Sequence, residues 1–297
     1  MKRVEPGIYA LAVGESGPGS SERKIGALLI DAGKLRPEDA EAVLALQREQ
    51  GLRFGNAAVK LGLLTEADIQ QVLSRQFNYP YLSRGEGGLA KELIAAYQPF
   101  SEPVERLRAL RSQLMLRWFG AEHQHKCLAV VSADEREGRS WLAANLAVVF
   151  SQLGERTLLI DGDMRRPTQD KIFNLESAVG LSTMLSGRSD RQAVQRISGF
   201  VDLSVLPAGP IPPNPHELLG RAQFGTLVRE LSAQFDVVLM DTPPAARSAD
   251  AQMLASACGG AMLVTRKNKT HTRAARKVVA ELTGTAIQMV GAVVNEF

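Results

Sequence analysis

A loop that could bind phosphate groups lies near the middle of the sequence. Residues 132–140 read SADEREGRS and follow an apolar run that predicts a buried strand. Loops of the form GxxxxGK(S/T), placed between a strand and a helix, hold phosphate oxygens through backbone amides, a basic side chain and a hydroxyl. Gly138 and Ser140 fit this form, whereas Arg139 stands in place of its lysine and Ala133 in place of its first glycine.

Acidic residues follow two further apolar runs. Asp161 and Asp163 come directly after the run 156–160, and Asp241 follows the run 237–240. The carboxyl ends of parallel strands meet at one edge of a sheet, and ligands of such sheets bind there. Asp241 is therefore suited to holding Mg²⁺ through water, close to the phosphate-binding loop.

Strands and helices alternate from about residue 101 onward. Apolar runs predict strands over 126–131, 156–160, 201–206, 237–240, 261–265 and 289–294. Helical patterns cover 102–118, 140–152, 223–235 and 271–282. This alternation, together with the loop, predicts an α/β fold of the P-loop NTPase type, in which helices cover both faces of a parallel sheet.

The rest of the chain is organised differently. A flexible arm rich in Gly, Ser and Pro is expected over 1–20, a small mainly helical domain over 21–82, a linker over 83–100 and the P-loop domain over 101–297. Within the helical domain, Pro37 suits the first turn of a helix, and Thr65 with Asp68 suits a capping box.

Composition restricts the function further. The hydrophobic fraction of 45% excludes wholesale disorder, and a net charge of +3 argues against DNA or RNA as a partner. No apolar run approaches the roughly 18 residues of a membrane-spanning helix. We therefore expect a cytoplasmic protein that reaches a membrane only through a partner.

The helical domain contains an internal repeat. Residues 24–47 and 53–76 form two copies of 24 residues, separated by a spacer of five. The matching positions are Lys24 with Arg53, Gly26 with Gly55, Gly33 with Gly62, Leu44 with Leu73, and Gln47 with Gln76. A paired helical hairpin accounts for the leucines and most of the glycines, but it does not account for the basic residue and the glutamine at the ends of each copy.

This repeat resembles the N-terminal (MshEN) domain of type II secretion and pilus assembly ATPases. In that family, two 24-residue motifs with a five-residue spacer bind cyclic di-GMP, whose two halves are related by a pseudo-two-fold axis. The resemblance implies that the ten matched residues contact cyclic di-GMP. Lys24 departs from the arginine of the family and lacks its planar fork. A hairpin that serves only for docking is the alternative.

The P-loop domain resembles the bacterial tyrosine kinases of exopolysaccharide assembly, and the whole chain resembles their EpsG type of chain-length-determinant protein tyrosine kinase. The resemblance rests on the loop and acidic residues above, on LPAGPIPPNPHELL over 206–219, on GAVVN over 291–295 and on an ExxRxxR helix. It implies ATP at Glu137, Gly138, Arg139, Ser140, Trp141 and Asn295, Mg²⁺ at Ser140, Asp163 and Asp241, and catalysis by Arg139, Asp161 and Asp163. Asp161 is then the candidate base for an incoming hydroxyl.

The same resemblance implies partners. In that family the ExxRxxR helix builds a ring of protomers, which here would involve Glu105, Arg108 and Arg111. It also implies a membrane chain-length-determinant protein as partner, and therefore a location at the cytoplasmic side of the inner membrane.

The acceptor tyrosines of the family are the main departure. All the tyrosines, which are Tyr9, Tyr79, Tyr81 and Tyr97, precede the P-loop domain, so we expect no acceptor tail of the usual kind. One alternative is a non-catalytic nucleotide-dependent scaffold that regulates a membrane polysaccharide partner. Another is a positioning ATPase of the MinD/ParA kind, but Asp134 stands where that group has an additional lysine.

Overall fold

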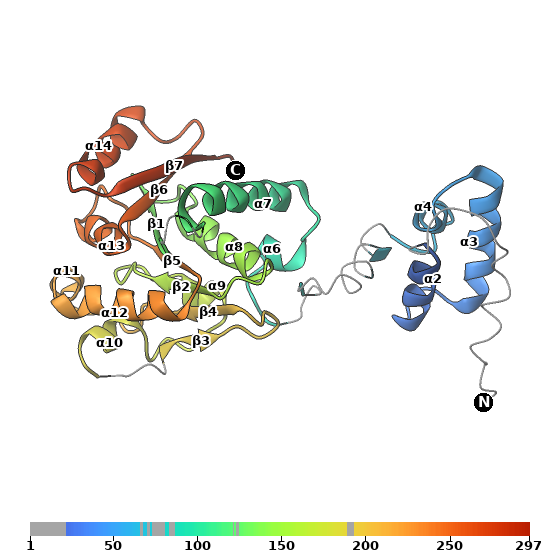
Figure 1. Cartoon of the computed structure of the whole chain (residues 1–297), viewed down its shortest axis with the longest axis horizontal. Helices are drawn as coiled ribbons and strands as arrows, with labels where there is room; N and C mark the ends of the chain where they lie inside the picture. The colour runs from blue at the N-terminus through green and yellow to red at the C-terminus, as the bar shows by residue number, and fades with distance from the viewer. Residues whose placement is uncertain are drawn as a thin grey trace. The chain divides into compact units, whose positions relative to one another are not determined.

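The chain folds into two compact units, one over 1–79 and the other over 80–297 (Figure 1). The computed structural model describes residues 22–65, 68–69, 72, 81–82, 87–120, 122, 125–188 and 193–297. The expected arm over 1–20 lies outside these residues, as do Leu73 and Gln76 of the repeat and the side chain of Lys24. No helix in the described ranges has the length and apolar character that crossing a membrane requires.

The N-terminal unit shows the repeat as repeated structure. Its helices in the described range include α2 (Glu22–Asp31), α3 (Pro37–Gln50) and α4 (Phe54–Lys60). Gly33 and Gly62, which are matching positions, end the first helix of each copy in the left-handed region, both with φ of 68°. Their N–H groups donate to matching carbonyls, those of Ile30 and Val59, at 2.9 Å. Glycine is required here because other side chains rarely adopt positive φ.

The second helix of each copy begins differently. Pro37 occupies the first turn of α3, as predicted. In the second copy, the Thr65 hydroxyl accepts from the Asp68 N–H at 3.2 Å, and the Asp68 carboxylate accepts from the Thr65 N–H at 3.1 Å. The predicted capping box is therefore confirmed. The unit is held together by a small apolar core that includes Leu29, Val43, Phe54, Ala57 and Val72.

The C-terminal unit is built on one seven-stranded sheet with the order β3-β4-β2-β5-β1-β6-β7. The strands are β1 (Cys127–Ser132), β2 (Thr157–Asp161), β3 (Gln195–Arg196), β4 (Leu203–Leu206), β5 (Val237–Asp241), β6 (Gly260–Arg266) and β7 (Gln288–Asn295). All strand pairs are parallel except β3 with β4. The six predicted strands are present, and the two-residue edge strand β3 was not predicted.

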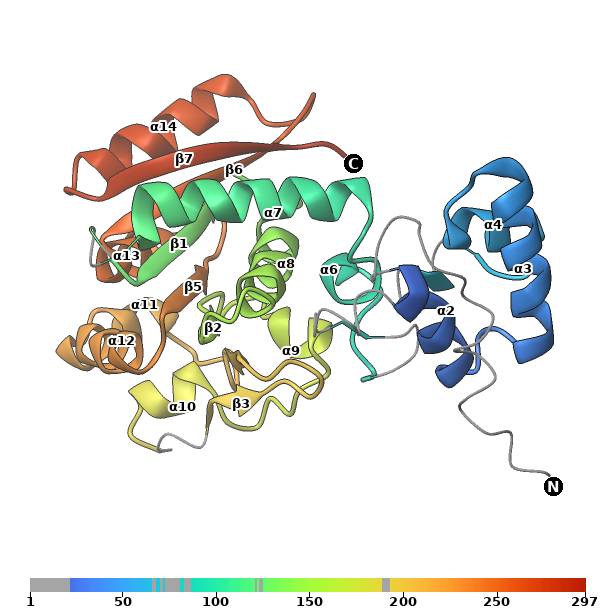
Figure 2. The same ribbon diagram turned by 45° about the vertical axis from the view of Figure 1, so that its right-hand side comes forward.

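Helices cover both faces of this sheet, as the alternation predicted (Figure 2). Strand residues pack alternately into two cores because successive side chains of a strand point to opposite faces. One core includes α6 (Ile94–Tyr97), α7 (Glu102–Leu114) and α8 (Arg139–Ser151). The other includes α10 (Leu181–Leu185), α11 (Pro215–Leu219), α12 (Ala222–Gln234), α13 (Asp250–Cys258) and α14 (Thr272–Thr283). The short helix α9 (Gln169–Ile172) follows β2.

The described part of the segment over 83–100 differs from the expected linker. Leu93 is fully buried in the core beneath α8, and the Ala95 N–H donates to Asn145 Oδ1 at 3.0 Å. The side chain of Gln152, at the end of α8, donates to the Ala95 carbonyl at 2.9 Å. The glycines at the start of the segment suggested a linker, but its apolar residues after Gly88 belong to the core of the C-terminal unit.

The predicted helix over 102–118 also changes character before its end. It is an α-helix to Leu114 and a π-helix over Met115–Phe119 (η1). Trp118 is buried there, and its indole N–H donates to the Cys127 carbonyl at 2.9 Å. This contact joins the π-helix to the start of β1, beyond the end of the helical pattern, so helical periodicity gave no indication of the wider turn.

We expect Asp68→Ala to destabilise the N-terminal unit by about 1 kcal/mol, because it removes one half of the capping box. A hydrogen bond from Lys34, followed by that from Thr65, lowers the pKa of Asp68 to about 2. The charged form is therefore stabilised by folding, so the contribution is present above about pH 4 and is lost as the pH falls through about 2. Hydrogen exchange over residues 54–72 of the whole chain measures the effect.

The matched control is Asp39→Ala. Asp39 occupies the equivalent position of the first copy, but its helix begins after Arg36, which makes no side-chain cap. An effect of Asp39→Ala as large as that of Asp68→Ala would show that the capping box contributes nothing.

Candidate functional site

The loop that was predicted to bind phosphate connects β1 to α8, so it lies between a strand and a helix as its sequence predicted. Gly138 is the residue before α8 and has a φ of 88°. A Cβ atom at this position would lie 2.0 Å from Nδ2 of Asn295, so the Asn295 side chain would have to move. The loop therefore favours glycine chiefly for its backbone conformation, and the nearby Asn295 side chain adds to the cost of a larger residue.

Glu137 and Asn295 hold this loop in place. The buried carboxylate of Glu137 accepts from the Asp134 N–H at 2.9 Å and from the Thr270 hydroxyl. Asn295 donates to the Glu137 carbonyl at 3.4 Å. The Trp141 side chain points elsewhere, because its indole N–H donates to the Glu92 carbonyl at 2.7 Å. Among the residues predicted to bind ATP, Trp141 directs its side chain away from the loop.

The predicted carboxylates come together at the carboxyl ends of adjacent strands. Asp161 ends β2 and Asp241 ends β5, and the two residues are register partners. Both are fully buried. Asp161 accepts hydrogen bonds from the backbone N–H groups of Asp163 at 3.1 Å and of Thr168 and Gln169 at 3.0 Å each.

Arg139 joins the loop to two of the carboxylates, those of Asp163 and Asp241. Its Nε donates to Asp241 Oδ1 at 3.0 Å, and its terminal nitrogens donate to Asp163 Oδ2 at 3.3 Å and to Ser132 Oγ at 2.9 Å. The residue is only 8% exposed. A buried guanidinium needs acidic partners, and the two carboxylates supply them.

Sequence reasoning did not find Gln169 or Ser132. Gln169 is fully buried, and its Nε2 donates to Asp241 Oδ2 at 2.8 Å and to the Ser140 carbonyl at 3.1 Å. Both residues are neutral, and neither stands at a position that the motifs require, so only their neighbours in space reveal them. In the described part of the chain, Gln169 Oε1 and Thr168 Oγ1 are buried without a hydrogen-bond partner, which leaves acceptor atoms beside the carboxylates.

The environment raises two pKa values in this group. Burial, with the charge of Asp241 as the next cause, raises the pKa of Asp161. Burial also raises the pKa of Asp163, although backbone hydrogen bonding and the charge of Arg139 oppose the rise. Carboxylates with raised pKa values take up protons more readily, and they occur often in functional sites.

The donor set suits Mg²⁺ only in part. Magnesium is usually held by one or two carboxylates together with water and phosphate oxygens. Asp163, Asp241 and the hydroxyl of Ser140 offer such a set beside the loop. Among the described residues, no group of three or more His, Cys, Asp or Glu side chains could hold a metal ion. The set fits an ion that a bound phosphate group helps to coordinate.

Ion pairs connect Glu135 of the loop to two arginines from other loops. Glu135 pairs with Arg166 at 2.5 Å and with Arg247 at 3.2 Å. The three residues come from the loops that follow β1, β2 and β5, so these loops meet at one edge of the sheet. Glu135 and Arg247 were not identified as site residues from the sequence.

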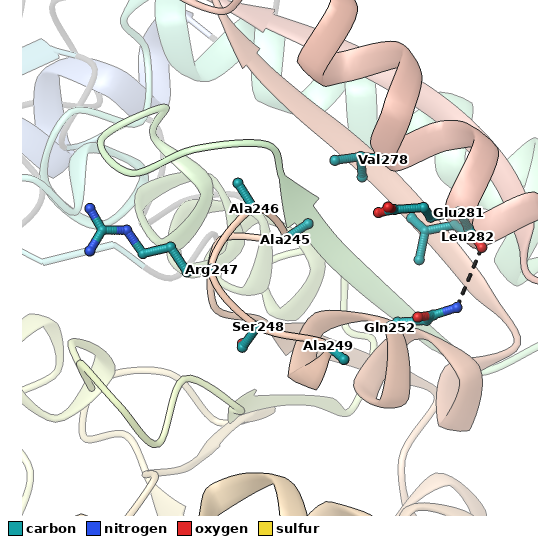
Figure 3. A pocket seen from close by; sticks show the side chains of 9 residues that line it. All are labelled: Ala245, Ala246, Arg247, Ser248, Ala249, Gln252, Val278, Glu281 and Leu282. Atoms are coloured by element: carbon teal, nitrogen blue, oxygen red, sulfur yellow. Dashed lines mark hydrogen bonds between the residues drawn. The ribbon is translucent and has the colours of Figure 1, made fainter.

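A cavity of about 320 Å³ lies on another side of the loop that follows β5. Figure 3 shows its lining side chains, and Arg247 points away from the other labelled residues. The lining residues are Ala245, Ala246, Arg247, Ser248, Ala249, Gln252, Val278, Glu281 and Leu282. None of the residues that were predicted for a site lines this cavity.

Among the residues predicted for cyclic di-GMP, those that the structure describes lie on or beside α2, α3 and α4 of the N-terminal unit. Gly26 lies against the ring of Phe54, and Gly55 lies against Ile69. Leu44 and Gln47 on α3 are half-buried, and Arg53 is exposed just before α4.

The residues predicted for the ring share α7. Arg108 pairs with Glu105, and Arg111 donates to the Val149 carbonyl at 2.7 Å. Arg111 therefore fastens α7 to α8 within the protomer.

Known proteins resemble this chain over about two thirds of its length or more. Tyrosine-protein kinase YwqD of Bacillus subtilis (strain 168) is 38% identical over 207 residues, which cover 70% of this chain and 86% of that protein. Tyrosine-protein kinase wzc of Salmonella typhi is 30% identical over 204 residues, which cover 69% of this chain but 28% of that protein. No family model matches the chain.

Solved structures agree with these relatives. The chimerical protein CapA2B2 has a TM-score of 0.65 and 35% identity, covering 78% of this chain and 98% of that chain. The kinase domain of Escherichia coli tyrosine kinase ETK has a TM-score of 0.66 and 28% identity, covering 69% of this chain and 79% of that chain. The septum site-determining protein MinD of Pyrococcus horikoshii, complexed with Mg-ADP, shares the fold at 20% identity and a TM-score of 0.51. With the loop and its carboxylates in place, the chain belongs to the bacterial tyrosine-protein kinase family.

Proposed function

We propose that this protein is an ATP- and Mg²⁺-dependent tyrosine-kinase-like enzyme that regulates the chain length and export of an exopolysaccharide. The observation that carries the proposal is the meeting of Asp161, Asp163 and Asp241 with the Gly138 loop at one edge of the sheet. Phosphoryl transfer depends on positioning and on neutralising charge, and both are available there.

The residues of the site have distinct tasks in this proposal. The backbone amides after Gly138 and the positive end of α8 bind phosphate oxygens. Ser140, Asp163 and Asp241 would hold Mg²⁺, which neutralises charge on the transferred phosphoryl group. Asp161 accepts the proton of the incoming hydroxyl, a task that its raised pKa supports.

We expect Gly138→Ala to lower ATP affinity by more than about tenfold, because the added Cβ would displace Asn295 and strain the loop. Gly154→Ala is the matched control, since Gly154 has a similar φ of 92° but no atom within 4 Å of an added Cβ. Calorimetric titration with ATP compares the two variants. Equal ATP affinities of the two variants would show that the loop does not bind the nucleotide.

Phosphotransfer is tested with labelled ATP. We expect Asp241→Asn to reduce hydrolysis and protein labelling by about 10²-fold or more, since half of the Mg²⁺ carboxylate set is lost. Asp236→Asn is the control, because Asp236 lies just before the same strand, β5, and pairs with Arg156 outside the site. Two variants with equal activity would contradict the assignment of Asp241.

The acceptor group is expected to lie on another protein. Tyr97 donates to the Leu89 carbonyl at 3.2 Å, and Tyr81 packs edge-on against Phe100, so both serve packing. Tyr9 and Tyr79 lie outside the described residues. Stoichiometric phosphotyrosine on any of these four residues, found by mass spectrometry after incubation with ATP, would contradict this expectation.

A regulatory scaffold is the second candidate. It would bind ATP without transferring phosphate and would act on a membrane chain-length-determinant protein at the inner membrane. A ring of protomers joined through Glu105, Arg108 and Arg111 of α7 serves either function, since their spacing of three residues places them along one side of the helix. Absent phosphotransfer with intact ATP binding would favour the scaffold.

We also propose that the N-terminal unit binds cyclic di-GMP and thereby regulates the C-terminal unit. The repeated geometry of Gly33 and Gly62 supports two equivalent half-sites for a ligand of two equivalent halves. Arg53 is exposed and is the stronger basic anchor of the two copies, because its planar fork suits guanine and phosphate.

We expect Arg53→Ala to weaken cyclic di-GMP binding by about tenfold or more, with the whole chain as sample in calorimetry. The control is Arg36→Ala, which removes another exposed arginine of the same unit that pairs only with Asp39 among the described contacts. Absence of heat with the unaltered chain at high micromolar ligand would identify the unit as a docking module.

A further inference from the structure

We propose that Arg139 occupies the magnesium position of the site until a nucleotide arrives, so that nucleotide enters first and the metal ion second. This order rests on the proposed nucleotide-binding function and adds to it a specific role for the arginine that replaces lysine. One buried guanidinium group, with a different partner on each of its three nitrogens, carries the proposal.

The guanidinium lies between the two carboxylates that would hold the ion. Its Nε is 3.0 Å from Asp241 Oδ1, and one terminal nitrogen is 3.3 Å from Asp163 Oδ2. The other terminal nitrogen is 2.9 Å from the Ser132 hydroxyl. The Arg139 side chain is 9% exposed, and those of Asp163 and Asp241 are 5% and 0% exposed, so solvent screens these pairs little.

The remaining oxygens of both carboxylates are engaged as well. Asp241 Oδ2 accepts from Gln169 Nε2 at 2.8 Å. Asp163 Oδ1 accepts from the N–H groups of Arg165 at 3.2 Å and Arg166 at 3.0 Å. Every carboxylate oxygen of the proposed metal set therefore has a hydrogen-bond donor before any ligand binds.

A divalent ion cannot enter this arrangement beside the guanidinium. Magnesium requires oxygen ligands at about 2.0–2.1 Å in octahedral geometry. Two of the oxygens it would use face the positive charge of Arg139. Moving the guanidinium away without a new anionic partner would separate a buried ion pair, which is strongly unfavourable.

A nucleotide supplies that new partner. Arg139 is the first residue of α8 and directly follows Gly138, so its side chain starts where the loop amides bind phosphate. Phosphate oxygens accept two parallel hydrogen bonds from a guanidinium. When Arg139 turns to the phosphates, Asp241 Oδ1 and Asp163 Oδ2 lose a donor and become available to the metal ion.

The arginine suits this role better than a lysine would. Its planar group reaches Asp241, Asp163 and Ser132 through three separate nitrogens, whereas lysine has one nitrogen on a flexible stem. With arginine in place of lysine, the loop residue that contacts phosphate also serves as the cation that neutralises Asp163 and Asp241 before a ligand binds.

Binding of Mn²⁺, followed by electron paramagnetic resonance on the whole chain, tests the order. We expect no specific Mn²⁺ binding by the unaltered protein without nucleotide, and binding at least about tenfold tighter once ADP is present. Arg139→Gln and Arg139→Ala should bind Mn²⁺ without nucleotide, again at least about tenfold tighter than the unaltered protein. Arg156→Lys is the control, because Arg156 pairs with Asp236 away from the site.

Calorimetry with ADP in excess EDTA supplies the second readout, which needs no variant. Retained nucleotide binding under these conditions supports the order, and binding that occurs only with the metal present overturns it. Equal Mn²⁺ affinity with and without ADP also overturns it, even if a variant fails to fold. If ADP does not bind either with or without metal, the result contradicts the proposed nucleotide-binding function itself and not only the order of binding.

Discussion

The burial of three carboxylates at one edge of the sheet is the constraint on which the site depends. Asp161 and Asp241 are completely buried, and a buried charge is stable only with partners. Arg139 provides a positive charge, while Gln169 and the backbone after β2 provide hydrogen-bond donors. The loops that follow β1, β2 and β5 are thereby drawn together, which forms the proposed phosphate site before any ligand is present.

The sheet makes this arrangement possible by placing strand ends in register. β1, β2 and β5 are adjacent and parallel, so Ser132, Asp161 and Asp241 end neighbouring strands on the same edge. The central helix α8 is buried along most of its length, which fixes the direction in which Arg139 starts. Asn295 at the end of β7 then holds the loop through its hydrogen bond to the Glu137 carbonyl.

Much of this could be predicted from the sequence, because strand patterns and the acidic residues that follow them are local signals. Asp161 and Asp241 were placed correctly for that reason. The contacts of Gln169 and Ser132 could not be predicted, because neutral polar residues have no characteristic pattern and their partners lie on other elements. The segment around Leu93 resembled a linker because its glycines come first, while its apolar residues bury against a helix that lies fifty residues later.

The position of Arg139 affects the raised pKa of Asp163. The charge of Arg139 lowers the pKa of Asp163, whereas burial raises it. Once the guanidinium turns to a phosphate group, burial acts on this carboxylate with less opposition, and its affinity for a proton or another cation increases. Because the site excludes most water, another cation must replace the positive charge of Arg139 once the guanidinium has turned away from Asp163 and Asp241. In the proposed order of binding, the nucleotide therefore prepares the carboxylates for a metal ion through electrostatics.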